Sequence, residues 1–356
     1  MLWSPEGDAA RCALCERRCL IPVGQGGFCK TRYNEDGTLM SRTYGDLSAV
    51  ESRPIEIKPF YHYWPGSTAL TFSSWSCNLT CRWCQNYHLS RRPPSPAGRT
   101  HTAPEELVVR ALGAGDAGLC ASFQEPTLLY EYCLELFPLA RQSGLYCCFV
   151  SNGYMTGEAL DGLARAGLDG LKVDIKGGPD LYREHCGGAD GTVPWRRAQE
   201  ARGLGLHVEV VCLLVTDLND GPEQVSELVG EHLHRLGPDV PLHFTRYHPV
   251  KAFGRPPTPP GRLERAREIA FKAGVRFPYV GNLPGNRYEN TWCPRCGKLL
   301  VMRDGPQVLE YRISAEKRCP GCGEPIPITG EGRRTEEQVN RLTRKQVNKS
   351  SEQVKK

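Results

Sequence analysis

The sequence predicts an α/β fold in which a parallel sheet forms an open or partial barrel. Between residues 68 and 280, short apolar runs alternate with segments of helical pattern. Proline stands where several of these helices would begin, a position at which it is well tolerated. Such alternation is typical of βαβ units. Six or seven units are fewer than the eight of a closed barrel, so the sheet is expected to stay open.

The individual elements follow from these runs. The predicted strands are Thr68–Ser74, Gly118–Phe123, Leu145–Val150, Leu168–Asp174, His207–Val215, Pro241–Tyr247 and Val275–Val280. The predicted helices are Pro104–Gly113, Leu128–Gln142, Thr156–Ala166, Pro194–Gly203, Pro222–Leu236 and Pro260–Ala273. We expect an N-terminal four-cysteine segment with an irregular connector (1–66), the barrel (67–288), a C-terminal four-cysteine module (289–330) and a charged tail (331–356).

Three cysteines lie just after the first predicted strand, at the edge where chemistry sits in such barrels. Cys77, Cys81 and Cys84 have the spacing Cys-x3-Cys-x2-Cys. Thiolates are the usual ligands of iron–sulfur clusters, and a four-iron cube needs four ligands. Three thiolates leave one iron open to a small molecule. The alternative is a zinc knuckle completed elsewhere, but zinc ligands usually come as two Cys-x2-4-Cys pairs.

The same motif, with the aromatic Trp83 before its last cysteine, resembles the radical S-adenosylmethionine (SAM) superfamily. That resemblance implies that SAM chelates the open iron of a 4Fe-4S cluster. The reduced cluster would cleave SAM to methionine and a 5′-deoxyadenosyl radical, which abstracts hydrogen from a substrate. The protein would supply orientation and exclude side reactions.

Further stretches resemble one member of that superfamily, the radical SAM enzyme of the AmmeMemoRadiSam system, a relative of pyruvate formate-lyase activating enzymes. They occur in order across residues 12–330 and are Arg53–Pro59, His62–Gly66, Cys84–Asn86, Glu125–Thr127, Ser151–Tyr154, Val173–Gly177 and Val280–Asn282. Two segments depart from that pattern, Ala121–Gln124 and Val215–Asp220. Both lie near the expected pocket, so they bear on the substrate more than on the cofactor.

The resemblance also implies a set of SAM contacts. Glu125 matches the acidic position that binds the SAM amino group, although a carboxylate at a helix N-terminus is the simpler alternative. Ser151 and Asn152 are candidates for the SAM carboxylate or ribose. Lys176 is the candidate for the carboxylate and Asp174 for a ribose hydroxyl, with a plain ion pair as the alternative. The two remaining candidates are His248, which would close the pocket, and the backbone of Trp83, which would meet the adenine.

The C-terminal cysteines form two nearly identical Cys-Pro-x-Cys-Gly knuckles. Cys293 and Cys296 make the first, and Cys319 and Cys322 the second. Four thiolates in this arrangement predict a zinc ribbon, with mononuclear iron as the main rival. We expect the role to be structural, because a closed four-thiolate site has no open coordination position.

The N-terminal cysteines are less decisive. Their spacing is irregular for zinc, so zinc and an auxiliary iron–sulfur cluster both stay open for this site, which consists of Cys12, Cys15, Cys19 and Cys29. The remaining cysteines fall in or beside predicted core elements. Buried cysteine behaves as a small hydrophobe, so we expect core packing for most of them. Cys186, between His185 and Gly187, is the one to test for a role.

The composition bears on class and compartment. Seventeen cysteines, mostly clustered at metal-ligand spacing, indicate a reducing cell interior and not secreted disulfides. The N-terminus has no apolar signal region, and no stretch approaches the ~18 apolar residues of a membrane span. We expect a cytoplasmic protein. Of the net charge of +5, the segment 331–356 contributes +4, from eight Lys/Arg against four Glu; charge alone does not indicate nucleic acid.

Three functional hypotheses follow. The first is a radical SAM enzyme with an unidentified substrate, supplied with electrons by a ferredoxin or flavodoxin and associated with Memo-like and AMMECR-like proteins. The second is an activase that makes a glycyl radical on a partner protein. The third, from a different class, is a zinc-bearing nucleic-acid-binding protein whose affinity would fall steeply with salt.

Overall fold

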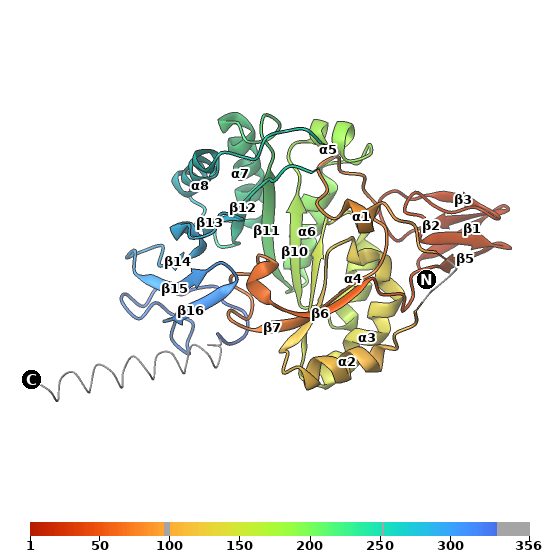
Figure 1. The fold of residues 1–356 in the computed structure, drawn as a ribbon, viewed down its shortest axis with the longest axis horizontal. Coiled ribbons are helices and arrows are strands. Elements are labelled where there is room, and N and C mark those ends of the chain that lie inside the picture. Colours follow the sequence, from red (N-terminus) through yellow and green to blue (C-terminus); the bar gives the residue numbers. More distant parts are fainter. Residues whose placement is uncertain (96–99, 251–252, 333–356) are drawn as a thin grey trace, which may run out of the picture.

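A computed structural model describes residues 1–95, 100–250 and 253–332, with one eight-stranded sheet at its centre (Figure 1). The strand order is β13-β12-β11-β10-β9-β8-β7-β6. Neighbours from β7 to β13 are parallel, and β6 is antiparallel to β7. The strands are β6 (Ala49–Pro54), β7 (Thr68–Ser73), β8 (Gly118–Ala121), β9 (Tyr146–Ser151), β10 (Gly170–Ile175), β11 (His207–Leu214), β12 (Leu242–Arg246) and β13 (Pro278–Gly281).

Six longer helices follow the parallel strands and cover the outer face of the sheet (Figure 1). They are α2 (Pro104–Gly113), α3 (Tyr130–Gln142), α4 (Gly157–Ala166), α6 (Val193–Gly203), α7 (Pro222–Leu236) and α8 (Pro260–Ala273). Short helical turns are α1 (Tyr87–Ser90), α5 (Pro179–His185), η1 (Ile55–Ile57), η2 (Pro126–Leu129) and η3 (Arg287–Glu289). The predicted partial barrel is confirmed, and α2, α7 and α8 begin and end where the sequence predicts.

The barrel strands form because they can be buried on both faces. All four residues of β8 and five of the six in β9 are buried, as parallel strands between helices and a barrel interior require. The cysteines outside the three clusters share this burial: each is fully buried, as predicted for core packing, and they are Cys120, Cys133, Cys147, Cys148, Cys186 and Cys212.

The N-terminal region is more ordered than the irregular connector that we expected from residue 36 to 66. A first sheet holds β1 (Trp3–Glu6), β2 (Ala9–Cys12) and β3 (Leu20–Pro22), and β4 (Arg32–Glu35) pairs with β5 (Thr38–Ser41). The strand β6 lies at the edge of the barrel sheet. These strands are short and largely polar, so tertiary pairing and not an apolar pattern defines them.

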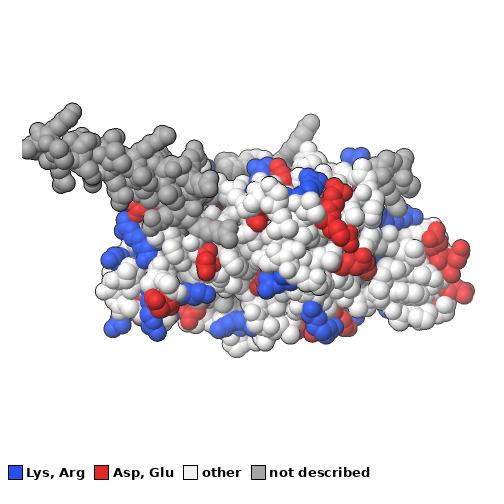
Figure 2. Space-filling model, turned by 90° about the horizontal axis from the view of Figure 1, so that it is seen from below, with Lys and Arg blue, Asp and Glu red and all other residues white. Residues whose placement is uncertain are grey.

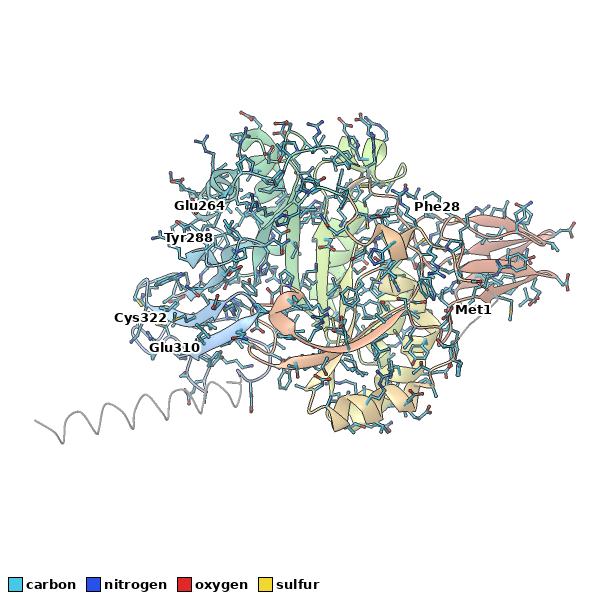
Figure 3. The ribbon with its side chains drawn as sticks, in the orientation of Figure 1. Met1, Phe28, Glu264, Tyr288, Glu310 and Cys322 are labelled. Carbon is cyan, nitrogen blue, oxygen red and sulfur yellow. The ribbon has the colours of Figure 1, made fainter. Side chains whose placement is uncertain are left out.

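The C-terminal module is a separate three-stranded sheet of β14 (Thr291–Trp292), β15 (Leu299–Asp304) and β16 (Gln307–Tyr311). It lies at the opposite end of the molecule from the N-terminal sheets, as the positions of Cys322 and Phe28 show (Figure 3). Its core is continuous with the barrel through Phe277 and Tyr279. Of the predicted tail, residues 333–356 lie outside the described residues.

The N-terminal ends of the barrel strands are closed by the segment 55–66, which is anchored on a buried carboxylate. Glu209 of β11 is fully buried and accepts hydrogen bonds from the backbone N–H groups of Tyr61 and His62 at 3.1 and 2.8 Å. The ring nitrogens of His207 and His243 lie 3.0 and 2.7 Å from its oxygens. Burial alone would raise the pKa of Glu209, but these histidine contacts hold it well below its usual range.

A buried guanidinium joins this closure to the C-terminal module. Arg303 of β15 donates to the carbonyl oxygen of Tyr61 at 2.8 Å, to that of Glu289 at 3.1 Å and to Oγ1 of Thr291 at 2.9 Å. The C-terminal module is therefore attached to the barrel by buried polar contacts as well as by its apolar core.

Among the helices that the structure describes, none is long and apolar enough to cross a membrane.

The variant Glu209→Gln is expected to lower the free energy of unfolding by at least about 2 kcal/mol at pH 7, because its amide N–H₂ faces donors and loses charge-assisted hydrogen bonds. The folded-state pKa of Glu209 is lowered, so this contribution is present above the unfolded pKa of about 4.5 and is lost as pH falls. The difference from wild type should therefore shrink in acid. Urea unfolding at several pH values measures it.

The exposed Glu231, paired with Arg235 on α7, provides the matched control. Glu231→Gln should change the free energy of unfolding by less than about 0.5 kcal/mol at any pH. Equal effects of the two substitutions would contradict the anchoring role of Glu209.

Candidate functional site

A cavity of about 420 Å³ opens at the C-terminal ends of the barrel strands, and the three predicted cluster cysteines line it. Cys77, Cys81 and Cys84 belong to the loop between β7 and α1. Side chains from the ends of β10 and from the loops after β8 and β9 complete the wall. The structure therefore places the three cysteines at the edge that the sequence predicts.

The cysteine loop is held by contacts with distant parts of the chain. Nε of Arg17 donates to the carbonyl of Asn78 at 3.0 Å, and Nη1 of the same guanidinium donates to that of Gly187 at 2.6 Å. The hydroxyl of Ser76 donates to the carbonyl of Cys29 at 2.5 Å. On its other side, the backbone N–H of Arg82 donates to His185. These bonds fix the loop between the N-terminal module and the loop after α5.

Asn152 connects the cysteine loop to the loop that follows β9. Its Nδ2 donates to Oδ1 of Asn78 at 2.8 Å and lies 3.6 Å from Sγ of Cys77. The backbone N–H of Leu79 also approaches that sulfur, at 3.4 Å. Two N–H groups therefore point at Cys77, and such donors stabilise the charge of a thiolate ligand.

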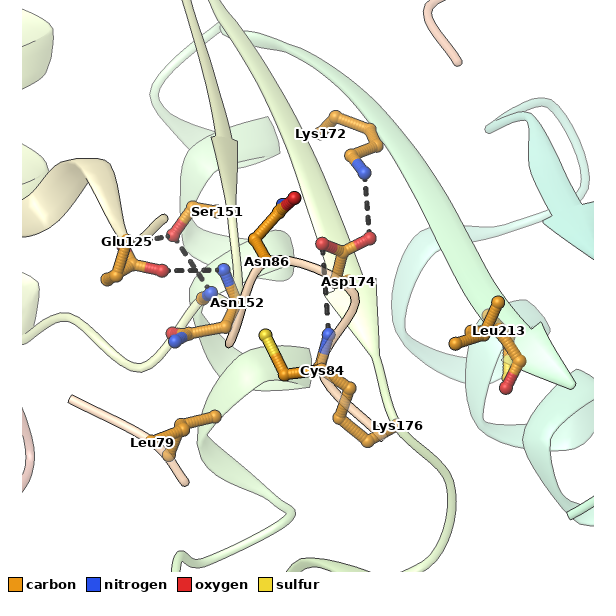
Figure 4. A network of polar contacts seen from close by, with 12 residues as sticks. Leu79, Cys84, Asn86, Glu125, Ser151, Asn152, Lys172, Asp174, Lys176 and Leu213 are labelled. Atoms are coloured by element: carbon orange, nitrogen blue, oxygen red, sulfur yellow. Dashed lines mark hydrogen bonds and ion pairs between the residues drawn. The ribbon is translucent and has the colours of Figure 1, made fainter. Parts of the chain in front are cut away.

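Glu125 is 1% exposed and accepts four hydrogen bonds from its own chain, of which Figure 4 shows those from Ser151 and Asn152. Thr127 donates twice, through its N–H and its hydroxyl, and Ser151 donates once to the same Oε1. The N–H of Asn152 donates to Oε2 at 2.9 Å. Glu125 thus caps η2, as the simpler alternative held, and also lines the cavity. Burial raises the pKa of Glu125.

Asp174 lies between two lysines on the cavity wall (Figure 4). Nζ of Lys172 donates to its Oδ1 at 2.7 Å, and Nζ of Lys176 lies 3.8 Å from its Oδ2. Burial alone would raise the pKa of Asp174, but the two ammonium groups lower it. Burial alone would lower the pKa of Lys176, but the Asp174 carboxylate together with the nearby Cys81 raises it. The Asp174–Lys176 ion pair, which was the alternative to a SAM contact, is present, and Lys172 is a third member.

Cys81 has a second thiol beside it. A hydrogen bond with Cys186 lowers the pKa of Cys81 to about 7, and the Lys176 ammonium acts in the same direction. By contrast, burial and then the nearby Glu125 carboxylate raise the pKa of Cys77. Cys186 is the core cysteine that the sequence singled out for testing, and it packs against the cysteine loop.

Three residues around the cavity hold left-handed backbone conformations that L side chains rarely adopt. Ser76, just before Cys77, has φ +72°, Phe123 has φ +72° and Asn282 has φ +57°. The backbone carbonyl oxygen of Phe123 accepts a hydrogen bond from Nδ2 of Asn86 at 2.6 Å. Such conformations cost on the order of 1 kcal/mol each and cluster at functional sites.

The other predicted contacts lie as follows. Trp83 is 2% exposed and lines the cavity, with its ring packed 5.9 Å from that of Phe253. Ser151 reaches the cavity only through its bond to Glu125. His248 is exposed, outside the cavity wall, and its carbonyl accepts from the Gln85 side chain. A SAM contact for each of these residues stays a prediction.

These residues fit a 4Fe-4S cluster with bound SAM. The cavity offers three thiols for three irons and space for a small molecule beside them. Among the described residues, Oε2 of Glu125 accepts one hydrogen bond, from Asn152, and so retains a lone pair for an ammonium donor. Lys176 supplies a cation for a carboxylate on the Cys81 side of the cavity.

The C-terminal cysteines come together as predicted. The sulfurs of Cys293, Cys296, Cys319 and Cys322 all lie within 4.8 Å of one another. The pair distances of 3.6 Å (Cys293–Cys322) and 3.7 Å (Cys296–Cys319) match the ~3.8 Å expected for thiolates about 2.3 Å from one tetrahedral ion. This group can bind a single metal ion.

The N-terminal cysteines converge differently. All four line one small cavity together with Asn78 of the cysteine loop. Within the described ranges, however, they do not form a compact single-ion group of the kind that the C-terminal cysteines form. Arg17 also lines this cavity, and its guanidinium bonds only carbonyl oxygens. The four cysteines can therefore act together as metal ligands, with a cation beside them.

Several residues of the site were not assigned a role from the sequence. Lys172 could have been found, since residues two apart on a strand share a face and it precedes Asp174 by two. Asn78 lies inside the motif but carries no signal of its own. Arg17 contacts residues 61 to 170 positions away, and no local pattern indicates such contacts.

Comparisons with known proteins agree with this geometry. The family model of the radical SAM superfamily matches residues 75–229. The uncharacterised protein MJ0808 of Methanocaldococcus jannaschii is 35% identical over 325 residues, which are 91% of this chain and 96% of the relative.

Two solved structures have similar folds at low identity. Streptococcus suis SuiB bound to S-adenosylmethionine is 14% identical, with a TM-score of 0.47 over 62% of this chain and 50% of that chain. A domain of a pyruvate-formate lyase-activating enzyme from Bacteroides vulgatus is also 14% identical, with a TM-score of 0.40 over 47% of this chain and 99% of that domain. From the family model and the site that it covers, we conclude that the chain belongs to the radical SAM superfamily of enzymes.

Proposed function

We propose that this enzyme cleaves SAM reductively at a 4Fe-4S cluster and uses the resulting 5′-deoxyadenosyl radical to abstract hydrogen from a substrate, as a member of the AmmeMemoRadiSam type. The observation that supports this most strongly is the convergence of three thiols, an acidic acceptor and an ammonium on one cavity. These are Cys77, Cys81, Cys84, Glu125 and Lys176.

The chain's own residues would hold and orient the bound groups. The three cysteines ligate the cluster, and Asn152 and the N–H of Leu79 donate to the sulfur of Cys77. Glu125 accepts from the SAM amino group. Lys176 donates to the SAM carboxylate. Asp174, whose Oδ1 accepts from Lys172, still has an acceptor available for a ribose hydroxyl. The cluster and SAM supply the electron and the radical.

We further propose a one-electron donor of the ferredoxin or flavodoxin class and association with Memo-like and AMMECR-like proteins. Nucleic acid is not part of the proposal. On the face shown in Figure 2, Lys and Arg are interspersed with Asp and Glu and do not gather into one basic surface. A nucleic-acid site would call for such a surface.

The first test measures 5′-deoxyadenosine after anaerobic reconstitution with iron and sulfide, reduction with dithionite and addition of SAM. Wild type should form the product, and Cys81→Ala should form none, because one iron loses its protein ligand. The core variant Cys133→Ala is the control and should retain both iron and product, since Cys133 lies in the packing of α3. Product formation by Cys81→Ala would refute the proposal.

A second test concerns the acceptor for the SAM amino group. Glu125→Gln keeps a carbonyl oxygen for the donors Thr127 and Ser151, but it removes the negative charge and the acceptor for the N–H of Asn152. We expect SAM to bind at least about tenfold more weakly, a loss of about 1.4 kcal/mol, with the iron content unchanged. Equilibrium binding of SAM to the reconstituted protein measures this. Glu227→Gln, on the exposed face of α7, should bind SAM like wild type.

The proposed metal sites use different cysteines, so substitutions can test each site separately. We propose zinc at Cys293, Cys296, Cys319 and Cys322, and a second iron–sulfur cluster at Cys12, Cys15, Cys19 and Cys29. The half-buried guanidinium of Arg17, which lines the N-terminal cavity together with these four cysteines, suits an anionic centre such as an iron–sulfur cluster.

A variant with alanine at Cys77, Cys81 and Cys84 should therefore retain iron and sulfide from the N-terminal site and one zinc per chain. Adding Cys12→Ala and Cys15→Ala should remove the remaining iron and leave the zinc. Metal and sulfide analysis of the reconstituted proteins provides the answer. A triple variant that contains two zinc ions per chain and no iron would show that the N-terminal cysteines bind zinc instead.

A further inference from the structure

One ammonium group in the cavity has no anionic partner. Lys58 follows η1, lines the cavity and is 4% exposed. Among the described residues, its Nζ forms no ion pair and no hydrogen bond; its contact is the ring of Phe123, whose centroid lies 4.2 Å away. Burial lowers the pKa of Lys58. A buried cation without a counter-charge is costly to the folded protein.

The neighbouring wall carries an amide in the same condition. Gln124 is 7% exposed and lines the same cavity, and neither Nε2 nor Oε1 has a hydrogen-bond partner in the described parts of the chain. Buried polar groups are nearly always hydrogen-bonded, and an exception calls for an explanation. Gln124 follows Phe123, whose left-handed backbone turns this segment at the cavity wall.

The other charged groups of the cavity already have partners. Lys172 and Lys176 both contact Asp174, on opposite sides of its carboxylate (Figure 4). Arg53 pairs with Glu51 at 2.8 Å. Glu125 accepts four hydrogen bonds. Among the described lysines and arginines of the cavity wall, Lys58 is therefore the one without an anionic partner. Gln124 follows Phe123, whose ring Lys58 contacts, and its amide also lacks a partner.

We propose that Lys58 and Gln124 form an oxyanion subsite, and hence that the substrate carries a carboxylate or phosphate group that Lys58 neutralises and Nε2 of Gln124 hydrogen-bonds. Oε1 of Gln124 remains to accept from a neighbouring N–H or O–H of the substrate. The proposal rests on the proposed function in placing the substrate in the SAM cavity. It specifies what that function leaves open, the chemical class of the substrate.

The subsite predicts effects on stability and on binding that have opposite signs. If the two side chains are unpaired until an anion binds, apolar side chains of similar length should stabilise the protein without ligand, because a desolvated polar group is removed. The same substitutions should weaken anion binding. A merely structural role would instead make both substitutions destabilising.

The test uses the reconstituted full-length protein and the variants Lys58→Met and Gln124→Met. Thermal unfolding is followed anaerobically while inorganic phosphate or, separately, succinate is added, with sodium chloride keeping the ionic strength constant. A binding anion raises the unfolding midpoint as its concentration rises. Lys272→Met is the control, since this lysine is exposed on α8 and pairs with Glu268.

We expect a saturable rise in the unfolding midpoint of wild type and Lys272→Met, with the half-saturating anion concentration at least tenfold higher in Lys58→Met and Gln124→Met. Both cavity variants should unfold at a higher temperature than wild type when no anion is present. The anion with the lower half-saturating concentration, phosphate or succinate, identifies which oxyanion the substrate carries.

No saturable rise with either anion, or an equal rise in Lys58→Met, would overturn the proposal. So would a lower ligand-free midpoint in both variants. Because these measurements need no turnover, they remain interpretable if wild type forms no 5′-deoxyadenosine. Failure of SAM cleavage and failure of the subsite are therefore distinct results.

Discussion

The carboxylate of Glu125 is the constraint on which the arrangement of the site depends. Its four donors come from η2 and from the end of β9 with the residue that follows it, two segments that share no backbone ladder. Asn152, held by that carboxylate, in turn bonds Asn78 and reaches the sulfur of Cys77. One buried charge thus sets the relative positions of three strand-end loops. In a low-dielectric interior such a network is strong when every member is satisfied.

A parallel barrel leaves its strand-end loops without regular hydrogen bonds, so side chains must supply them. The N-terminal module contributes here, because Arg17 holds the cysteine loop and the loop after α5 together, and Ser76 bonds the carbonyl of Cys29. The N-terminal cysteines are consequently coupled to the cluster loop by the bond between Ser76 and Cys29, by Arg17, and by Asn78, which lines their cavity. A metal at the N-terminal site would stabilise the geometry of the SAM site whether or not it carries electrons.

The elements predicted from the sequence were those with a local signal. Helices α2, α7 and α8 begin at proline, and their bounds agree with the prediction. The three cysteines fall at the predicted strand end because the cysteine motif, Cys77–Cys84, directly follows the apolar run of Thr68–Ser74 in the sequence. By contrast, β6 carries Glu51, Ser52 and Arg53 and has no apolar run, and its place beside β7 depends on tertiary pairing. Glu209 binds the backbone of Tyr61 and His62, almost 150 residues away, and no periodicity reports such a contact.

Whether a buried polar group has a hydrogen-bond partner is the property that is hardest to predict from the sequence. Gln124 and Glu125 are consecutive, both are buried and both line the cavity, yet Glu125 accepts four hydrogen bonds and Gln124 has none within the described structure. Nothing in the sequence distinguishes the hydrogen bonding of these two consecutive polar residues. The two residues have different roles in the fold. The hydrogen-bonded carboxylate of Glu125 positions loops in the absence of ligand, whereas the amide of Gln124 and the ammonium of Lys58 remain available to bind a ligand. Positioning and recognition therefore depend on adjacent residues that contribute oppositely to the stability of the empty protein.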